Sequence, residues 1–272
     1  MSGRQTGKST VLGVPLRPWT MSRTLSWICE HVAVSRQGLA EPAYLITANL
    51  NYCMLTARNS DLPAINEGAA GVVADGMPLV VWSWLSPRAE SLPERVAGSQ
   101  LIDELCGEAA KHGQRVYFLG GQPDVLRDAV KSLRSKHRGL IVAGAHSPPF
   151  RTLSEQEDRE LVRRVRSAKP DILLVAFGQP KGERWLAKYR KALNVPVSIQ
   201  LGASFDFAAG RVRRAPRWIQ DSGLEWAFRL AMEPKRLWRR YARVVPRFLA
   251  GFAAQRFRQR RENYPRHEPA HI

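Results

Sequence analysis

Residues 74–99 read ADGMPLVVWSWLSPRAESLPERVAGS, and the rest of the chain is organised around this stretch. Asp75 directly follows the apolar run 71–74 and precedes Gly76, where a buried strand is expected to end and the backbone to turn. An α/β protein binds its ligands at the carboxyl ends of such strands. Arg95 stands in a charged turn, 94–99, ahead of another helical pattern. The stretch therefore predicts a crevice that an acid and a guanidinium group share.

Strand-like and helix-like segments alternate on both sides of this stretch. The apolar strand segments do not alternate with polar residues, which is typical of a parallel sheet covered on both faces. The sequence predicts an α/β fold: a Rossmann-like, mainly parallel sheet with helices on both faces. Expected strands lie at 44–48, 72–74, 115–119, 140–143, 171–176 and 197–201, and expected helices at 21–37, 100–112, 123–136, 154–168 and 183–192. Ser99 is the expected N-cap of the helix at 100–112, which Gly113 ends.

The composition divides the chain into four parts. We expect a flexible leader and first helix at 1–40, an α/β catalytic core at 41–210, a basic helical appendage at 211–261 and a disordered tail at 262–272. The appendage holds 15 Lys and Arg against 3 Asp and Glu, a net +12 of the total +18. At helical spacing its residues from 236 to 252 separate into an apolar face and a cationic face. Such a charge indicates a phosphate-bearing partner, which is a nucleic acid, an anionic membrane surface or a diphosphate substrate.

Several classes of protein are excluded or disfavoured. The three cysteines show no CxxC or Cys/His ligand spacing, which disfavours a disulfide framework or zinc site and fits a reducing cytoplasm. We assign no metal to the six scattered histidines. GKST near the N-terminus lacks the upstream glycine of a phosphate-binding P-loop. No apolar run reaches 18 residues, so we expect no membrane-spanning helix.

Polar residues follow several of the expected strands. Thr47, Asn49 and Asp75 would emerge at the same edge of a parallel sheet, although each alone is also read as a turn or capping residue. Gly120 and Gly121 stand between a strand and a helix, where a phosphate could approach backbone N–H groups. A tight turn without a ligand explains this glycine pair equally well.

Two further strand-to-helix turns carry candidate groups. In the turn 177–183, Lys181 could meet an anion, and Gln179 stands beside it. In the turn 202–207, Asp206 could accept hydrogen bonds from a base or a ribose. Neither turn decides the function alone.

Longer blocks resemble the WecG/TagA/CpsF family of bacterial glycosyltransferases, glycosyltransferase family 26. The likeness spans about residues 44–248 and rests on TANLNY, ADGMPLVVW, ERVAGS, the strand-GGQP turn, FGQPKGERW, GASFDFAAGRVRRAPRW and GLEWAFRLAMEPKRLWRRY, in this order. The resemblance implies an inverting enzyme that needs no metal or other cofactor. It would move a sugar from a UDP-sugar to a lipid-diphosphate-linked saccharide at the inner face of the cytoplasmic membrane, in cell-envelope or exopolysaccharide synthesis. The donor sugar is left open between an N-acetylmannosamine type, a uronic acid and a hexose.

The resemblance also implies roles for single residues. Asp75 matches the proposed catalytic base, and Thr47 and Asn49 match polar residues that line the pocket beside it. Arg95 matches an arginine thought to contact substrate, and Asp206 matches an acid implicated in holding the uracil.

The appendage would supply the positive charge that this chemistry requires. Arg229, Arg236 and Arg239 match arginines proposed to close over the diphosphate. Without a metal, guanidinium groups and helix N-termini would stabilise the charge developing on UDP. The chain departs from the family pattern G-x-P-K-Q-E at Gly182, which replaces the usual glutamine and leaves the sugar preference open.

Two other functions are weighed against the transferase. One is a basic nucleic-acid-binding protein, which the charge alone supports, since no RNP, KH or helix-turn-helix pattern is present. The other is a membrane-associated scaffold with an inactive transferase core, which Gly182 permits and Asp75 argues against. The expected partners are therefore a UDP-sugar, a polyprenyl-diphosphate-linked saccharide and the membrane surface, with no nucleic acid. Pairing of the chain with itself through apolar segments such as 82–84 is left open.

Overall fold

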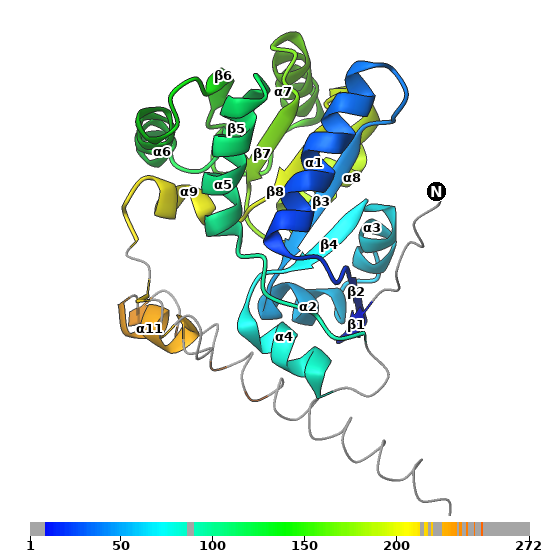
Figure 1. The fold of residues 1–272 in the computed structure, drawn as a ribbon, viewed down its shortest axis with the longest axis vertical. Coiled ribbons are helices and arrows are strands. Elements are labelled where there is room, and N and C mark those ends of the chain that lie inside the picture. Colours follow the sequence, from blue (N-terminus) through cyan, green and yellow to red (C-terminus); the bar gives the residue numbers. More distant parts are fainter. Residues whose placement is uncertain are drawn as a thin grey trace, which may run out of the picture.

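The computed structural model describes residues 9–85, 90–212, 215–216, 219, 225–232, 234–235, 238, 242 and 246, with only the backbone at 225, 226 and 229. Its centre is a six-stranded sheet in the order β4-β3-β8-β7-β5-β6, in which every neighbouring pair is parallel (Figure 1). The strands are β3 (Ala43–Ala48), β4 (Gly71–Ala74), β5 (Arg115–Gly120), β6 (Ile141–His146), β7 (Ile172–Ala176) and β8 (Val197–Gln200). The predicted Rossmann-like parallel sheet is thus confirmed.

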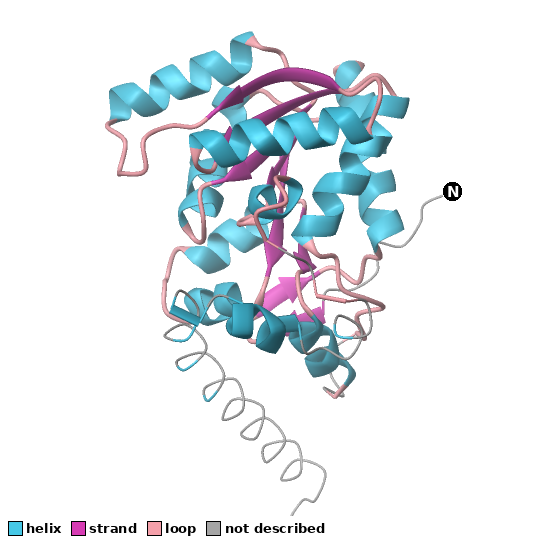
Figure 2. Cartoon of the chain, turned by 90° about the vertical axis from the view of Figure 1, so that its left-hand side faces the viewer, coloured by secondary structure: helices cyan, strands magenta, loops and turns pink. Residues whose placement is uncertain are grey.

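Helices cover both faces of the sheet, as Figure 2 shows. Successive residues of a strand point to opposite faces, so Leu45 packs in one core cluster and Ile46 in the other. Leu45 faces α1 (Met21–Arg36), α5 (Gly98–Lys111), α6 (Pro123–Lys136) and α9 (Ser204–Ala208). Ile46 faces α2 (Leu50–Thr56), α3 (Leu62–Gly68), α4 (Met77–Trp84), α7 (Glu155–Ser167) and α8 (Lys181–Leu193). Burial on both faces explains why the strands read as continuous apolar runs.

Local capping chemistry sets the start of some helices. Ser154 caps α7 and forms a reciprocal capping box with Glu157. The predicted cap of α5 at Ser99 is wrong, because α5 begins at Gly98, two residues earlier than expected, with Ala97 at the cap. Gly98 packs so closely that a Cβ there would lie 2.8 Å from the Ser204 hydroxyl oxygen. Glycine at 98 therefore lets the first turn of α5 pack closely against α9, and no side chain caps this helix.

The prediction of a flexible leader is wrong for residues 9–16. They form an antiparallel hairpin of β1 (Ser9–Val11) and β2 (Val14–Leu16). Val11, Val14 and Leu16 are fully buried in the cluster that contains α4, and the Arg17 amide donates to the Val72 carbonyl oxygen at 2.8 Å. Three apolar side chains are too few to show a periodic pattern, so only the packing against α4 and β4 reveals this element.

The C-terminal region is described only in part. Helix α11 spans Glu225–Met232, in agreement with a helical appendage at those positions. Of the predicted amphipathic face at 236–252, only Trp238, Ala242 and Pro246 are described, and Trp238 is 52% exposed. The tail at 262–272 lies outside the described residues, so the boundaries of these parts stay predictions. Within the described part of the chain, no helix is long and apolar enough to cross a membrane. Cys29, Cys53 and Cys106 are all free thiols.

Candidate active site

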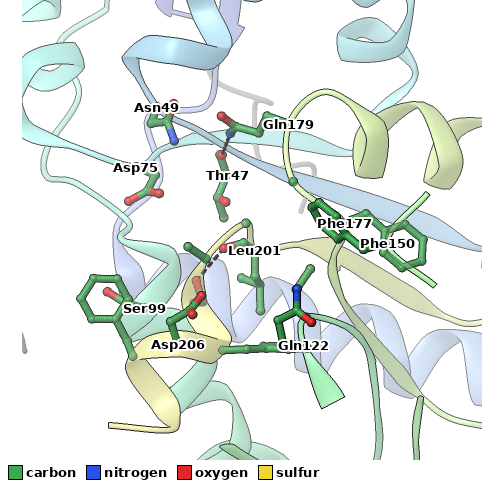
Figure 3. Close-up of a pocket in the computed structure, with 18 residues that line it drawn as sticks. Thr47, Asn49, Asp75, Ser99, Gln122, Phe150, Phe177, Gln179, Leu201 and Asp206 are labelled. Carbon is green, nitrogen blue, oxygen red and sulfur yellow. Dashed lines mark hydrogen bonds between the residues drawn. The ribbon is translucent and has the colours of Figure 1, made fainter. Parts of the chain in front are cut away.

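A cavity of about 560 Å³ lies where the strands β3, β4, β5, β7 and β8 end. This is the edge of a parallel sheet at which ligands bind. The side chains around it come from segments far apart in the sequence (Figure 3). The lining residues are Thr47, Asn49, Asp75, Ser99, Gly121, Gln122, Phe150, Ala176, Phe177, Gly178, Gln179, Leu201, Gly202, Ala203, Ser204, Phe205, Asp206 and Phe207.

Asp75 reaches the cavity because it is the first residue after β4. Its backbone amide donates to the Ala48 carbonyl oxygen at 2.7 Å, one step beyond the register pair Ala48–Ala74. Gly76 then turns the chain into α4 with a φ of +136°, a conformation that favours glycine. The Asp75 carboxylate is thus carried on rigid backbone at the sheet edge.

Thr47 and Asn49 line the cavity and also hold the edge together. The Thr47 hydroxyl donates to the Gln200 carbonyl oxygen at 2.8 Å, which ties β3 to β8. The Asn49 side chain caps α2 by accepting from the Tyr52 amide at 3.1 Å. The capping reading and the pocket-lining reading of Asn49 are therefore both correct. Thr47, Asn49 and Asp75 meet at one edge, as the strand pattern predicts.

The cavity is surrounded by the amino-terminal ends of helices. Each such end carries partial positive charge on backbone N–H groups that the helix itself does not use. These ends favour an anionic ligand, and phosphate groups are the anions most often bound in this way. The helices that begin within two residues of a lining residue are α2, α4, α5, α6, α8 and α9.

Comparison with known proteins identifies a family. A family model described as "Glycosyl transferase WecG/TagA/CpsF family" matches residues 9–262. The chain belongs to the WecG/TagA/CpsF family of glycosyltransferases. Its sequence is 28% identical over 263 residues to an N-acetylglucosaminyldiphosphoundecaprenol N-acetyl-beta-D-mannosaminyltransferase of Bacillus subtilis strain 168, covering 96% of this chain and 97% of that protein. A protein of the same name from Bacillus spizizenii strain ATCC 23059 is 28% identical over 225 residues, or 83% of this chain and 84% of that protein.

Family membership makes the chain a glycosyltransferase and favours this function over the two alternatives weighed from the sequence. The family match begins at residue 9 and therefore includes the β1–β2 hairpin, which lies outside the resemblance found at 44–248.

The structure places Gln179 in the cavity of this glycosyltransferase and Lys181 outside its lining. The Gln179 amide nitrogen donates to the Thr47 carbonyl oxygen at 3.3 Å, and its amide oxygen accepts from Asn51 at 3.5 Å. The Lys181 ammonium donates to the Arg151 carbonyl oxygen at 2.8 Å and lies over the ring of Phe177. The turn 177–183 therefore uses both side chains to brace itself, and a role for either in binding substrate stays a prediction.

The two glycines after β5 have different surroundings. Gly120 has a φ of +102°, and a Cβ there would lie 2.7 Å from the Ala176 carbonyl oxygen. Gly121 lines the cavity, and its amide already donates to that same oxygen at 3.2 Å. The Gly121 amide is thus engaged by β7. Close backbone approach explains the glycine at 120, and a φ of +72° favours glycine at 121.

Asp206 lies in the first turn of α9 and lines the cavity, as Figure 3 shows. Arg95 does not line the cavity, although the next residue, Val96, donates from its amide to the Ala74 carbonyl oxygen at 2.8 Å. The backbone at Arg95 is therefore close to the end of β4, and its contact with substrate stays a prediction. Arg229 belongs to α11, where only its backbone is described, and Arg236 and Arg239 lie outside the described residues.

Several lining residues have no signal in the local sequence pattern. Ser99 was expected only as a helix cap, and Gln122 only as part of a turn. Phe150 and Phe177 stand in loops after β6 and β7, where an aromatic residue has no fixed meaning. Their positions depend on which loops meet at the sheet edge.

Gly182 leaves room for the side chain of Gln200, which comes from β8. A Cβ at Gly182 would overlap the Gln200 carboxamide. Gln200 and Glu183 are both fully buried, and none of their side-chain N and O atoms has a hydrogen-bond partner among the residues that the structure describes. Burial raises the pKa of Glu183 to about 8, while its own backbone N–H and Arg184 act weakly in the opposite direction. The space above Gly182 is thus filled by the side chain of Gln200.

Gly182→Ala is expected to lower the free energy of unfolding by about 1–3 kcal/mol, because the new methyl group overpacks a closed space. In the Gln200→Ala background the same change should cost little, since the overlapping carboxamide is gone. Urea unfolding of the wild type, both single variants and the double variant measures this coupling. Strictly additive effects would show that the two positions do not share the space.

Proposed function

We propose that this glycosyltransferase moves a sugar from a UDP-sugar to the saccharide of a polyprenyl-diphosphate-linked acceptor, with inversion at the anomeric carbon and without a metal. The observation that supports it best is the placement of the Asp75 carboxylate in a cavity ringed by helix N-termini. A base and a site for diphosphate are the two features that this reaction requires. The names of the two Bacillus relatives favour an N-acetylmannosamine-type donor and a lipid-linked N-acetylglucosamine acceptor.

In the proposed mechanism, Asp75 accepts the proton of an acceptor hydroxyl group as its oxygen attacks the anomeric carbon in line. The bond between that carbon and the diphosphate oxygen breaks, and UDP leaves with the bonding electrons. The helix ends around the cavity would stabilise the charge that develops on the diphosphate, because helix N-termini carry partial positive charge. The arginines of the appendage would further stabilise the charge on the diphosphate. The uracil or ribose of UDP would interact with Asp206.

The same proposal places the enzyme at the inner face of the cytoplasmic membrane. Residues 211–261 carry a net charge of +12, and each cation near an anionic bilayer contributes about 1 kcal/mol to binding. A lipid-linked acceptor would then reach the cavity from the surface to which the appendage binds.

The test uses the full-length chain with UDP-N-acetylmannosamine, UDP-N-acetylglucosamine, UDP-glucuronic acid and UDP-glucose as donors. The acceptor is N-acetylglucosamine linked through a diphosphate to a short lipid. We expect transfer from UDP-N-acetylmannosamine, a product of inverted configuration by NMR, and unchanged rates in EDTA. Absence of both transfer and UDP binding with every donor would overturn the proposal, and loss of activity in EDTA would overturn its metal-free part.

A further inference from the structure

Phe150 is an exposed aromatic residue at the rim of the cavity. Its side chain lines the cavity, yet the residue is 90% exposed. Single exposed apolar side chains are common on protein surfaces, so the position of Phe150 at the rim of the cavity, and not its exposure, suggests contact with a ligand. In Figure 3 its ring lies beside Phe177 and across the cavity from Asp75 and Asn49.

The loop that carries Phe150 is anchored through the next residue, Arg151. Lys181 of α8 donates to the Arg151 carbonyl oxygen at 2.8 Å. The Arg151 guanidinium makes a two-pronged contact with the Glu157 carboxylate of α7, at 2.8 and 2.6 Å. The pair Pro148–Pro149 further limits the backbone before it. Phe150 is thus presented to the cavity by a braced loop, and a preformed platform loses little entropy on binding.

The position of Phe150 indicates which part of a ligand it meets. If Asp75 acts at the reacting bond, and the helix ends hold the diphosphate between, then the group farthest from Asp75 is the nucleoside. A flat phenyl ring interacts best with the face of another flat ring. We propose that Phe150 is the stacking platform for the uracil base of the donor, an inference that rests on the proposed function.

This role is compatible with Asp206 on the same cavity. Hydrogen-bonding groups of a uracil lie in the plane of its ring, whereas stacking occurs on the face. An edge contact from Asp206 and a face contact from Phe150 therefore do not compete. Phe150 recognises any planar base, and Asp206 would select among bases.

The test measures binding of UDP, UMP, ribose 5-phosphate and inorganic diphosphate to the wild type, Phe150→Ala and Phe150→Trp. Base stacking is worth about 1–3 kcal/mol, or roughly 5- to 150-fold in affinity. We expect Phe150→Ala to weaken the binding of UDP and UMP by about tenfold or more, and Phe150→Trp to keep wild-type affinity for both. Neither substitution should change the affinity for ribose 5-phosphate or inorganic diphosphate.

Leu39→Ala is the matched control, because Leu39 is another exposed apolar residue, 74% exposed, in the turn that precedes β3 at the opposite edge of the sheet. Unchanged UDP affinity in Phe150→Ala would overturn the inference, as would equal weakening of UDP and diphosphate. A raised KM for the acceptor alone would assign the ring to the acceptor and also overturn it. If the wild type neither binds UDP nor transfers sugar, the proposed function fails instead, so the two failures are distinguishable.

Discussion

Asp75→Asn is expected to lower kcat for sugar transfer by about 10²- to 10⁴-fold, the usual contribution of a general base. The carboxamide has the same shape and keeps the backbone bond to Ala48, but it cannot accept the proton of the acceptor hydroxyl group. Binding of UDP should therefore stay within about threefold of the wild type, since the loss belongs to the transition state. Initial rates with a saturating donor, together with calorimetric titration of UDP, separate these two effects.

Glu155→Gln provides the control for removal of a carboxylate. Glu155 lies in the first turn of α7, and its side chain is 80% exposed. We expect this variant to keep wild-type rates and UDP affinity. A correctly folded Asp75→Asn enzyme with wild-type kcat would assign the base to another group, while loss of UDP binding would make Asp75 a donor contact instead.

Glu183 is expected to make the protein less stable as the pH rises from about 5 to 8. Its carboxyl group is fully buried, and burial raises its pKa from 4.5 to about 8. Between these two values the folded chain retains a proton that the unfolded chain has released, so rising pH favours the unfolded state. The loss approaches about 1.4 kcal/mol per pH unit within this window and ends above the folded pKa. Stability attributable to this group is therefore complete at acid pH and smallest at pH 8 and above.

Glu183→Gln should remove this dependence while preserving the shape of the side chain. We expect the variant to be more stable than the wild type at pH 8, by on the order of 3 kcal/mol, and little changed at pH 5. Urea unfolding at pH 5, 6, 7 and 8 gives the difference between the two proteins, so other titrating groups cancel. Glu157→Gln is the contrasting control, because Arg151 lowers the pKa of the exposed Glu157 to about 2, so it does not titrate in this range. Parallel curves for the wild type and Glu183→Gln would mean that Glu183 is already ionised in the folded protein.

The sequence by itself determined the parallel sheet and the edge at which the site lies. Apolar runs such as those at β3 and β4 are local signals, and parallel strands necessarily bring their carboxyl ends to one edge. These two facts predict that Thr47, Asn49 and Asp75 are neighbours, and in the structure all three line the same cavity. The resemblance also identified the family correctly, because several of its blocks are long and ordered.

Only the tertiary structure decided which side chains at that edge remain available to a ligand. Thr47 bonds to Gln200 from 153 residues away, and Gln179 bonds to Thr47 across 132 residues. The Lys181 ammonium group donates a hydrogen bond to the Arg151 carbonyl oxygen, and the Gln200 side chain fills the space beside Gly182. A periodic pattern reports which face of an element is buried, but it cannot report which distant group meets a given donor or acceptor. The location of the site is therefore a property of local pattern and sheet geometry, whereas the assignment of its side chains depends on long-range packing.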